Sequence, residues 1–245
     1  MQSMKITING SNGRMGQAIA AAADEEGVEV VGRCDLGGDL KAEARDADVI
    51  VDFSFHETTE AVIETAKEMG KRLVIGTTGH TDKRRTDLRK RAGEIPTVWA
   101  GNYSIGVNLL FFLTRRAASI LDETYDAEVV ELHHRLKKDA PSGTAADLYE
   151  IILKERGLGF EALRHGRSGV IGERSTREVG VHALRGGDVI GDHTVLFAGP
   201  GERIELTHRA SNRRIYSTGA LRAARWIMDR TAGVYDMQDV LGFRS

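Results

Sequence analysis

The sequence predicts an α/β protein with a Rossmann-like, doubly wound parallel sheet domain, followed by a second α+β domain with a mixed or antiparallel sheet. Three observations support this prediction. In the first hundred residues, short β-rich runs alternate with helical stretches, the rhythm of a parallel sheet with helical crossovers. A glycine-rich turn separates the first run from the first helix. After Gly101 the pattern changes to a long apolar helix and alternating strands.

The first half is expected to supply the parallel sheet. Its apolar runs lack a clean alternation of apolar and polar residues, as expected for strands that helices cover on both faces. We expect strands at residues 5–9, 28–33, 49–53, 72–75 and 97–99, and helices at residues 14–26, 56–69 and 82–93.

The second half begins with residues 104–121, an almost uniformly apolar helix that must be buried or pack in an oligomer. Because chain termini often lie close together, the last helix is expected to pack back on the first domain. The first domain is therefore predicted to comprise residues 1–103 and 215–245, and the second residues 104–214. Further strands are expected at residues 126–133, 178–184, 193–197 and 203–208, and helices at residues 142–155 and 218–230.

Composition excludes several classes of protein. Lys and Arg number 34 against 36 Asp and Glu, so a net charge of -2 gives no overall attraction to nucleic acid or to an anionic membrane. The longest apolar stretch, residues 107–113, is far shorter than the ~20 residues of a membrane-spanning helix. A single cysteine, Cys34, excludes an internal disulfide and fits a reducing compartment. Since the start of the chain shows no export signal, a cytoplasmic location is expected.

The turn after the first strand places Gly10, Gly13 and Gly16 in a G-x-x-G-x-x-G spacing. Glycines let the backbone approach a pyrophosphate, whose charge is met by free N–H groups at the helix N-terminus. Asp35 follows the second strand, where a carboxylate can accept both ribose hydroxyls of an adenosine. Each feature alone has a simpler explanation, namely a glycine turn without a ligand or a turn-forming Asp. Together they predict a dinucleotide site.

The residues around Asp35 bear on the choice of cofactor. Leu36 cannot pair with a 2′-phosphate and Asp35 would repel one, so we expect NADH to be preferred. NADPH remains possible, because Arg14 is placed to reach over the adenosine edge. At the end of a later strand, Thr77 and Thr78 suit the nicotinamide amide or ribose, although an ordinary strand-to-helix turn explains them nearly as well.

The densest group of chemically active side chains holds His133, His134 and Lys137, just before a predicted helix start that Ser142 would cap. The free amides of such a helix start bind a carboxylate, and a lysine adds a full positive charge. We therefore expect a small dianionic substrate beside a proton-donating histidine.

Two other interpretations of this group are weaker. No metal site is expected, because adjacent residues on a strand point to opposite faces, and no cysteine or well-spaced carboxylate completes a tetrahedron. A solvated basic loop does not explain why imidazole and ammonium groups gather immediately before a helix cap.

Taken together, these motifs resemble the 4-hydroxy-tetrahydrodipicolinate reductase family, also known as dihydrodipicolinate reductase. Two positions depart from the family pattern: Leu36 replaces a basic residue that some members use on the 2′-phosphate, and Gly101 stands where Pro or Ala is common. The resemblance covers nearly the whole chain and rests on residues 14–16, 76–79, 102–108, 133–145, 185–188, 201–203, 208–213 and 235–237.

The resemblance implies hydride transfer from NAD(P)H to a cyclic imine dicarboxylate, with loss of water, on the route to diaminopimelate and lysine. His133 matches the family's proton donor and Lys137 its partner in protonation. The substrate-binding positions would be His134, Ser142, Gly143 and Thr144. The cofactor-binding positions would be Gly10, Asn12, Gly13, Arg14, Met15, Asp35, Phe53, Gly76, Thr77, Thr78, Gly101, Asn102 and Tyr103.

The resemblance also implies roles for the two domains. The first would bind the dinucleotide, while the second would bind the substrate and join four subunits into a homotetramer. Two other functions fit parts of the sequence. Another Rossmann dehydrogenase, acting on a small amino or hydroxy acid, would lack the His-His, Lys and Ser-Gly-Thr run. A non-catalytic, NADH-responsive binding protein would need only the fold and Asp35, and would have no use for His133 or Lys137.

Overall fold

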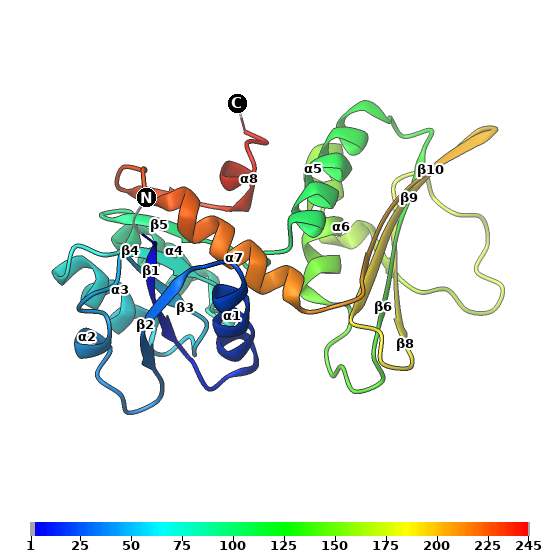
Figure 1. Cartoon of the computed structure of the whole chain (residues 1–245). Coiled ribbons are helices and arrows are strands. Elements are labelled where there is room, and N and C mark those ends of the chain that lie inside the picture. Colours follow the sequence, from blue (N-terminus) through cyan, green and yellow to red (C-terminus); the bar gives the residue numbers. More distant parts are fainter. Residues whose placement is uncertain (1–2, 245) are drawn as a thin grey trace. The chain divides into compact units, whose positions relative to one another are not determined.

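The computed structural model describes residues 3–244, and the chain divides into two compact units. Unit 1 comprises the chain up to Ile105 and again from Arg213 onward, and unit 2 comprises Gly106–Asn212. Each unit has its own sheet (Figure 1). The sheet of unit 1 is parallel and the sheet of unit 2 is mixed, which confirms the predicted fold class. The boundaries and roles predicted for the two domains stay predictions.

Within residues 3–244, unit 1 contains a six-stranded parallel sheet in the order β11-β5-β4-β3-β1-β2. The chain winds outward from β1 in both directions, as in a doubly wound sheet. The central strands β1 and β3 are buried almost throughout, which explains why their sequences lack alternation. The strands are β1 (Lys5–Asn9), β2 (Glu29–Cys34), β3 (Val49–Asp52), β4 (Arg72–Ile75), β5 (Pro96–Trp99) and β11 (Gly233–Tyr235).

The helices of unit 1 follow the prediction except at two short segments. The four-residue helices α2 and α8 were not expected, because one turn carries no periodic signal. Both begin with an aspartate that accepts hydrogen bonds from the first-turn amides, Asp39 in α2 and Asp236 in α8. The helices are α1 (Arg14–Glu25), α2 (Leu40–Glu43), α3 (Thr59–Glu68), α4 (Asp82–Ala92), α7 (Arg214–Ile227) and α8 (Met237–Val240).

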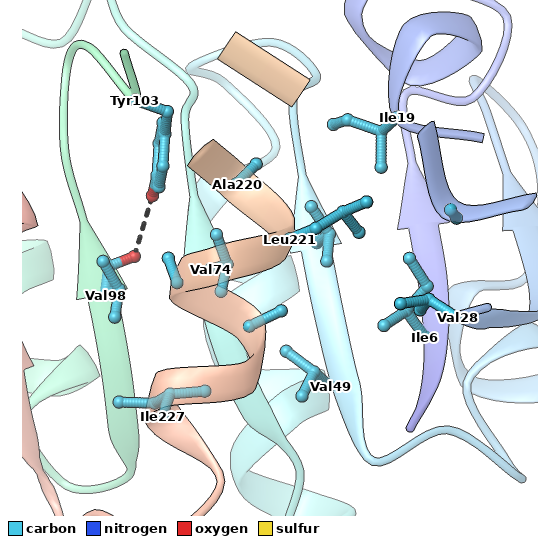
Figure 2. Close-up of a cluster of buried hydrophobic side chains, with 14 of the residues drawn as sticks. Ile6, Ile19, Val28, Val49, Val74, Val98, Tyr103, Ala220, Leu221 and Ile227 are labelled. Atoms are coloured by element: carbon cyan, nitrogen blue, oxygen red, sulfur yellow. Dashed lines mark hydrogen bonds between the residues drawn. The ribbon is translucent and has the colours of Figure 1, made fainter. Parts of the chain in front are cut away.

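The expectation that the last long helix returns to the first domain is confirmed. Figure 2 shows α7 lying across the sheet, with Leu221 and Ile227 among side chains of β1, β3, β4 and β5. Gly219 allows the close approach, because a Cβ at this position would collide with the backbone of Tyr103. Tyr103 is itself buried and donates to the carbonyls of Ile75 (2.7 Å) and Val98 (3.2 Å).

Unit 2, Gly106–Asn212, contains a five-stranded sheet in the order β10-β9-β6-β8-β7, with β6 antiparallel to β9 and parallel to β8. Helices α5 (Ile105–Ile120) and α6 (Gly143–Arg156) lie on one face of this sheet (Figure 1). The short strand β7 was not predicted, since three residues give too short a pattern. The strands are β6 (Asp126–His133), β7 (Leu163–His165), β8 (Val179–Arg185), β9 (Gly191–Gly199) and β10 (Glu202–Ala210).

Strand β6 lies at the centre of the unit 2 sheet and alternates strictly between its two faces. Ala127 and Val129 lie in the core beneath the helices, and Glu131 and His133 continue the same buried face. Glu128 points to the other face. The register of β6 therefore decides which of its polar side chains are buried under α6 and which are not.

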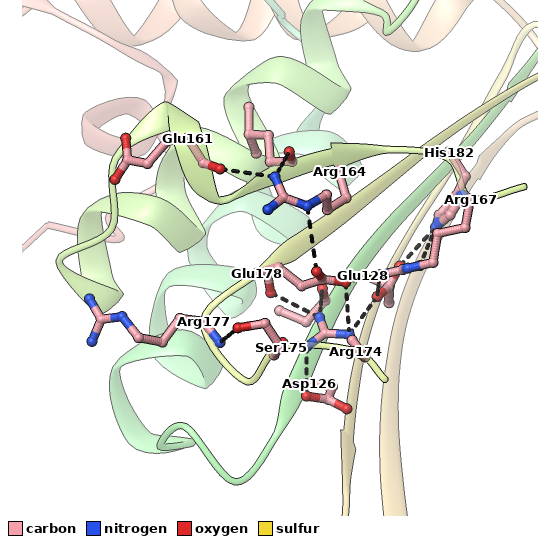
Figure 3. A network of polar contacts seen from close by, with 12 residues as sticks. Asp126, Glu128, Glu161, Arg164, Arg167, Arg174, Ser175, Arg177, Glu178 and His182 are labelled. Carbon is pink, nitrogen blue, oxygen red and sulfur yellow. Dashed lines mark hydrogen bonds and ion pairs between the residues drawn. The ribbon is translucent and has the colours of Figure 1, made fainter. Parts of the chain in front are cut away.

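Glu128 is the centre of a polar network on that other face (Figure 3). It accepts hydrogen bonds from Arg167 (2.7 Å), Arg174 (3.0 Å) and His182 (2.7 Å). Arg167 also pairs with Glu178 at 2.6 Å, so the network fastens the segment between β7 and β8 to the sheet. Burial tends to raise the pKa of Glu128, but these hydrogen bonds outweigh burial and lower the pKa from 4.5 to about 2.

No helix within residues 3–244 combines the length and the apolar character needed to cross a bilayer.

The ion pairs of Glu128 predict how the free energy of unfolding depends on pH. Because the pKa of Glu128 is lower in the folded than in the unfolded chain, its contribution is complete above pH 4.5 and is lost as the pH falls toward 2. We expect Glu128→Gln to flatten the loss of unfolding free energy over this range, measured by urea unfolding at a series of pH values. Glu150→Gln, at an exposed position on α6, is the control and should keep the wild-type slope. An unchanged slope in Glu128→Gln would contradict the assignment.

Candidate functional site

The glycine turn of unit 1 has the geometry that a phosphate-binding turn needs. Gly10 has a φ of 80°, and a Cβ there would come within 2.5 Å of the carbonyl oxygen of Phe53. A Cβ at Gly16 would collide with the turn itself. Gly13 is the N-cap of α1 and offers no capping side chain, so no side chain at this position competes with an anion for the first amides of the helix. The turn can therefore hold an anionic group against its backbone.

Asp35 lies across from this turn, as the sequence predicts. Its carboxylate accepts the amides of Asn12 (2.7 Å) and Leu36 (2.8 Å), and these hydrogen bonds lower its pKa below the ordinary value. A cavity of about 200 Å³ adjoins the carboxylate. Its lining includes Gly10, Asp35, Leu36, Phe55 and Val62, a largely apolar set that suits a flat ring.

A second carboxylate, Asp52, ties together the loops at the end of the sheet. It is fully buried and accepts hydrogen bonds from Asn9 (2.7 Å), Ser54 (2.5 Å) and Thr77 (2.7 Å), which follow or end three neighbouring strands. Burial raises the pKa of Asp52 against the effect of these donors. Because the Thr77 hydroxyl faces Asp52, Thr78 is the hydroxyl of this loop that is exposed.

The other predicted cofactor residues of unit 1 lie in different environments. Thr78 and Gly101 line a hollow of about 410 Å³ beside His80, Arg85, Arg89 and Trp99. Gly76, Phe53 and Tyr103 pack together: a Cβ at Gly76 would overlap the Phe53 ring, whose centroid lies 5.4 Å from that of Tyr103.

The side chain of Tyr103 is satisfied within the core, so only its backbone is available to a ligand. Asn102 accepts the amide of Ser104 at 2.9 Å. Arg14 is exposed on the first turn of α1, and Met15 packs against the core.

The chemically active group of unit 2 is organised around Glu131. The alternation of β6 places Glu131 and His133 on one face, with Glu131 Oε2 accepting from His133 Nδ1 at 2.5 Å. Arg185 on β8 donates to both carboxylate oxygens at 2.8 and 2.9 Å, and the amide of Ser142 donates to Oε1 at 3.1 Å. The predicted proton donor and the predicted helix start are therefore joined by one carboxylate.

The helix start has the expected cap. The hydroxyl of Ser142 accepts the amide of Ala145 at 3.2 Å, which confirms Ser142 as the N-cap of α6. The Ser142 hydroxyl also contacts Nε2 of His193 at 3.1 Å. The centroid of the His193 ring lies 5.1 Å from that of the His133 ring. The amide of Gly143 has no acceptor within residues 3–244, and a Cβ at Gly143 would meet no neighbour.

The environment sets the protonation of these groups. Burial lowers the pKa of His133 below its ordinary value, and Lys137 and Arg185 add to the effect, whereas Glu131 opposes it. Burial alone would raise the pKa of Glu131, but Arg185 and His133 outweigh burial and lower it. His193 is the most strongly affected, because burial and the neighbouring His133 lower its pKa to about 4.

The remaining predicted residues follow β6. Lys137 pairs with Asp139 at 2.9 Å, and its charge lies close enough to lower the pKa of both His133 and His193. His134 is half-buried directly after the strand, and its amide donates to Val189 at 2.7 Å. Unit 2 thus joins an imidazole and a capped helix start through Glu131, with an ammonium group near enough to affect the imidazole, while the predicted roles of these residues stay predictions. Within residues 3–244, no group of three or more His, Cys, Asp or Glu side chains is arranged to hold a metal ion.

Sequence reasoning did not single out Glu131, Arg185 or His193 as parts of this site. Glu131 had a detectable signal, because a residue two positions before His133 on a strand must share its face. Arg185 lies in a segment that carries the family resemblance, but its place in this site, like that of His193, depends on the pairing of β8 and β9 with β6, which brings both to Glu131 and His133.

The comparisons with known proteins cover both units. The model of "Dihydrodipicolinate reductase, N-terminus" matches residues 4–103, and that of "Dihydrodipicolinate reductase, C-terminus" matches residues 106–241. The chain is 49% identical to a 4-hydroxy-tetrahydrodipicolinate reductase of Akkermansia muciniphila, over 98% of each chain. It is 44% identical to one of Aromatoleum aromaticum, over 100% of this chain and 97% of that one.

Among solved structures, the chain resembles a dipicolinate-bound dihydrodipicolinate reductase from Paenisporosarcina sp. TG-14. The TM-score is 0.77 at 24% identity, covering 97% of this chain and 99% of that one. At this identity the likeness concerns the fold, and it agrees with the architecture described above.

The buried histidine of β9 predicts a second effect of pH on stability. The unfolded chain takes up a proton on His193 near pH 6.5, whereas the folded chain does so only near pH 4, so stability falls as the pH drops between these values. His193→Gln should make this fall smaller, as followed by thermal unfolding from pH 7 to pH 4. His165→Gln, at an exposed position on β7, should behave like the wild type. Equal slopes in all three proteins would show that His193 is not buried in its neutral form.

Proposed function

Because the chain belongs to the dihydrodipicolinate reductase family, we propose that it reduces 4-hydroxy-tetrahydrodipicolinate to tetrahydrodipicolinate with a hydride from NAD(P)H and loss of water. This places it in the biosynthesis of diaminopimelate and lysine. The observation that carries the proposal is the match to both halves of the family along nearly the whole chain. The chemistry of the two sites is consistent with it.

In this proposal unit 1 binds the dinucleotide. Glycines at positions 10 and 13 leave the first amides of α1 available to a pyrophosphate. Asp35 would accept the ribose hydroxyls, because each of its oxygens has a second lone pair beside the amide that it already accepts. The bound cofactor supplies the hydride. Roles for Gly76, Thr78 and Gly101 follow from their place at the same end of the sheet.

We propose further that NADH is preferred over NADPH. Leu36 is 86% exposed beside the Asp35 carboxylate and offers no charge to a 2′-phosphate. The lowered pKa of Asp35 keeps this carboxylate ionised at neutral pH, where it repels such a phosphate. Arg14, exposed on α1, is the cation that would allow NADPH to bind less tightly.

Unit 2 binds the substrate in this proposal. The start of α6, at Gly143 and Thr144, would hold one substrate carboxylate, and His134 and Lys137 would supply further contacts. Hydride addition to the conjugated imine leaves an enamine that must gain a proton on carbon. Nε2 of His133 would give that proton, since Nδ1 is engaged by Glu131.

The family resemblance also leads us to propose a homotetramer in the cytoplasm. The face of the unit 2 sheet that α5 and α6 leave uncovered carries partly exposed apolar side chains, which fits burial against other subunits. They are Val130, Leu132, Leu184 and Leu196.

A coupled assay tests the activity and the cofactor together. The substrate is generated from pyruvate and aspartate semialdehyde by the preceding synthase, and the absorbance of NADH or NADPH is followed in parallel. We expect oxidation that depends on all components, with a higher kcat/KM for NADH. No oxidation with either cofactor would contradict the proposed function, whereas faster oxidation of NADPH would contradict only the cofactor preference.

Replacing the proposed proton donor separates an enzyme from a nucleotide-binding protein. His133→Gln should lower kcat by ~10²- to 10⁴-fold, because a general acid contributes this much, while the affinity for NADH measured by fluorescence stays unchanged. His165→Gln, at an exposed histidine of the same unit, should keep full activity. Wild-type turnover in His133→Gln would exclude His133 as the donor.

A further inference from the structure

Glu131 is a fully buried carboxylate. Its hydrogen-bond partners are two residues of the proposed substrate site, His133 and Ser142, and the cation Arg185. Its exposure is 0%, and charged groups are buried in this way only when they are paired. Oε2 accepts from His133 at 2.5 Å and from Arg185 at 2.8 Å. Oε1 accepts from Arg185 at 2.9 Å and from the amide of Ser142 at 3.1 Å. The two oxygens thus reach the proton donor on one side and the helix start on the other.

The contact with Nδ1 fixes how His133 presents its ring. A carboxylate in a bidentate pair with arginine is ionised and can only accept, so Nδ1 of His133 must carry a hydrogen. Nε2 is then the nitrogen that exchanges a proton with a substrate. A Cβ at Gly191 would lie 2.9 Å from Nε2, so the glycine keeps space open beside this nitrogen.

The charges around His133 make Glu131 the group that favours its protonated form. Lys137 from the loop after β6, Arg185 from β8 and burial all disfavour the imidazolium, and His193 from β9 lies against the ring. Glu131 is the carboxylate that opposes them. Without Glu131, the pKa of His133 would fall further, and a smaller fraction of the ring would be protonated at neutral pH.

We propose that Glu131 is a positioning residue of the reductase. It holds Nδ1 of the proton-donating His133 against its own carboxylate and favours the protonated form of the ring, while its second oxygen anchors the start of α6. The proposal rests on the proposed function. It couples the acid and the carboxylate-binding amides through one side chain, so that both keep a fixed distance from a bound substrate. Arg185 completes the arrangement, because it neutralises Glu131 and donates to the carbonyl of Asp139 at 2.6 Å.

The test compares Glu131→Gln, Glu131→Asp and Glu128→Gln with the wild type. Glu128 is the matched control, since it is a carboxylate on the same strand in an equally dense set of ion pairs, but on the opposite face of the sheet. The first readout is the pKa of His133 in the protein without substrate, from NMR of the ring, with the signal assigned by its absence in His133→Gln. The second is the pH profile of kcat/KM in the coupled assay.

We expect Glu131→Gln to lower the pKa of His133. Since a general acid works in its protonated form, the limb on which kcat/KM falls with rising pH should move to lower pH. At pH 7, kcat/KM should drop ~10- to 10²-fold and recover in part on acidification. Glu131→Asp keeps the charge but shortens the reach, so its effect should be intermediate. Glu128→Gln should leave both the pKa of His133 and the position of the limb unchanged.

Two results would overturn the proposal. One is a folded Glu131→Gln or Glu131→Asp in which the pKa of His133 and the pH limb stay at wild-type values. The other is loss of folding in both variants, established by circular dichroism, since Glu131 would then serve stability. If the wild type shows no reductase activity, the proposed function fails, while the NMR measurement still decides whether Glu131 controls His133.

Discussion

The structure of unit 2 depends on how one buried carboxylate is satisfied. Glu131 cannot be left unpaired in the core, and its partners come from three places: His133 on its own strand, Arg185 on β8 and the amide of Ser142. Meeting this requirement sets the course of the chain between β6 and α6, because Arg185 also holds the carbonyl of Asp139. The cluster that carries the proposed chemistry is therefore also what shapes the loop around it.

Unit 1 also contains a buried carboxylate, Asp52, but its partners are of a different kind. Asp52 is as deeply buried as Glu131, but its partners are the neutral side chains of Asn9, Ser54 and Thr77 and no cation. The pKa of Asp52 is accordingly raised, whereas that of Glu131 is lowered by its arginine. A carboxylate held by neutral donors can tie loops together without placing a full charge pair beside the proposed dinucleotide site. Glu131 in unit 2 must be ionised if it is to raise the pKa of the neighbouring His133.

Local signals explain which parts could be predicted from sequence. The glycine turn, Asp35 and the cap at Ser142 each depend on residues close in the chain, and all three lie where expected. The return of α7 to the first sheet was expected only because chain termini often lie close together, and the helix does pack there. Strands and helices of three or four residues, such as β7 and α2, were missed because they are shorter than the patterns that predict them. Pairing and packing between distant segments, which a single sequence does not display, decide the remaining features. They place Arg185 and His193 beside Glu131 and His133, and they bury the side chain of Tyr103.

The central claim is that a charged Glu131 orients His133 through Nδ1, and the position of the ring hydrogen tests it most directly. We would record ¹⁵N shifts of the His133 ring in the substrate-free protein, at a pH where the imidazole is neutral. The account predicts a hydrogen on Nδ1 and a bare Nε2, because Glu131 Oε2 can only accept at 2.5 Å. A neutral ring with its hydrogen on Nε2 would contradict it, since Nδ1 would then have nothing to donate to the carboxylate.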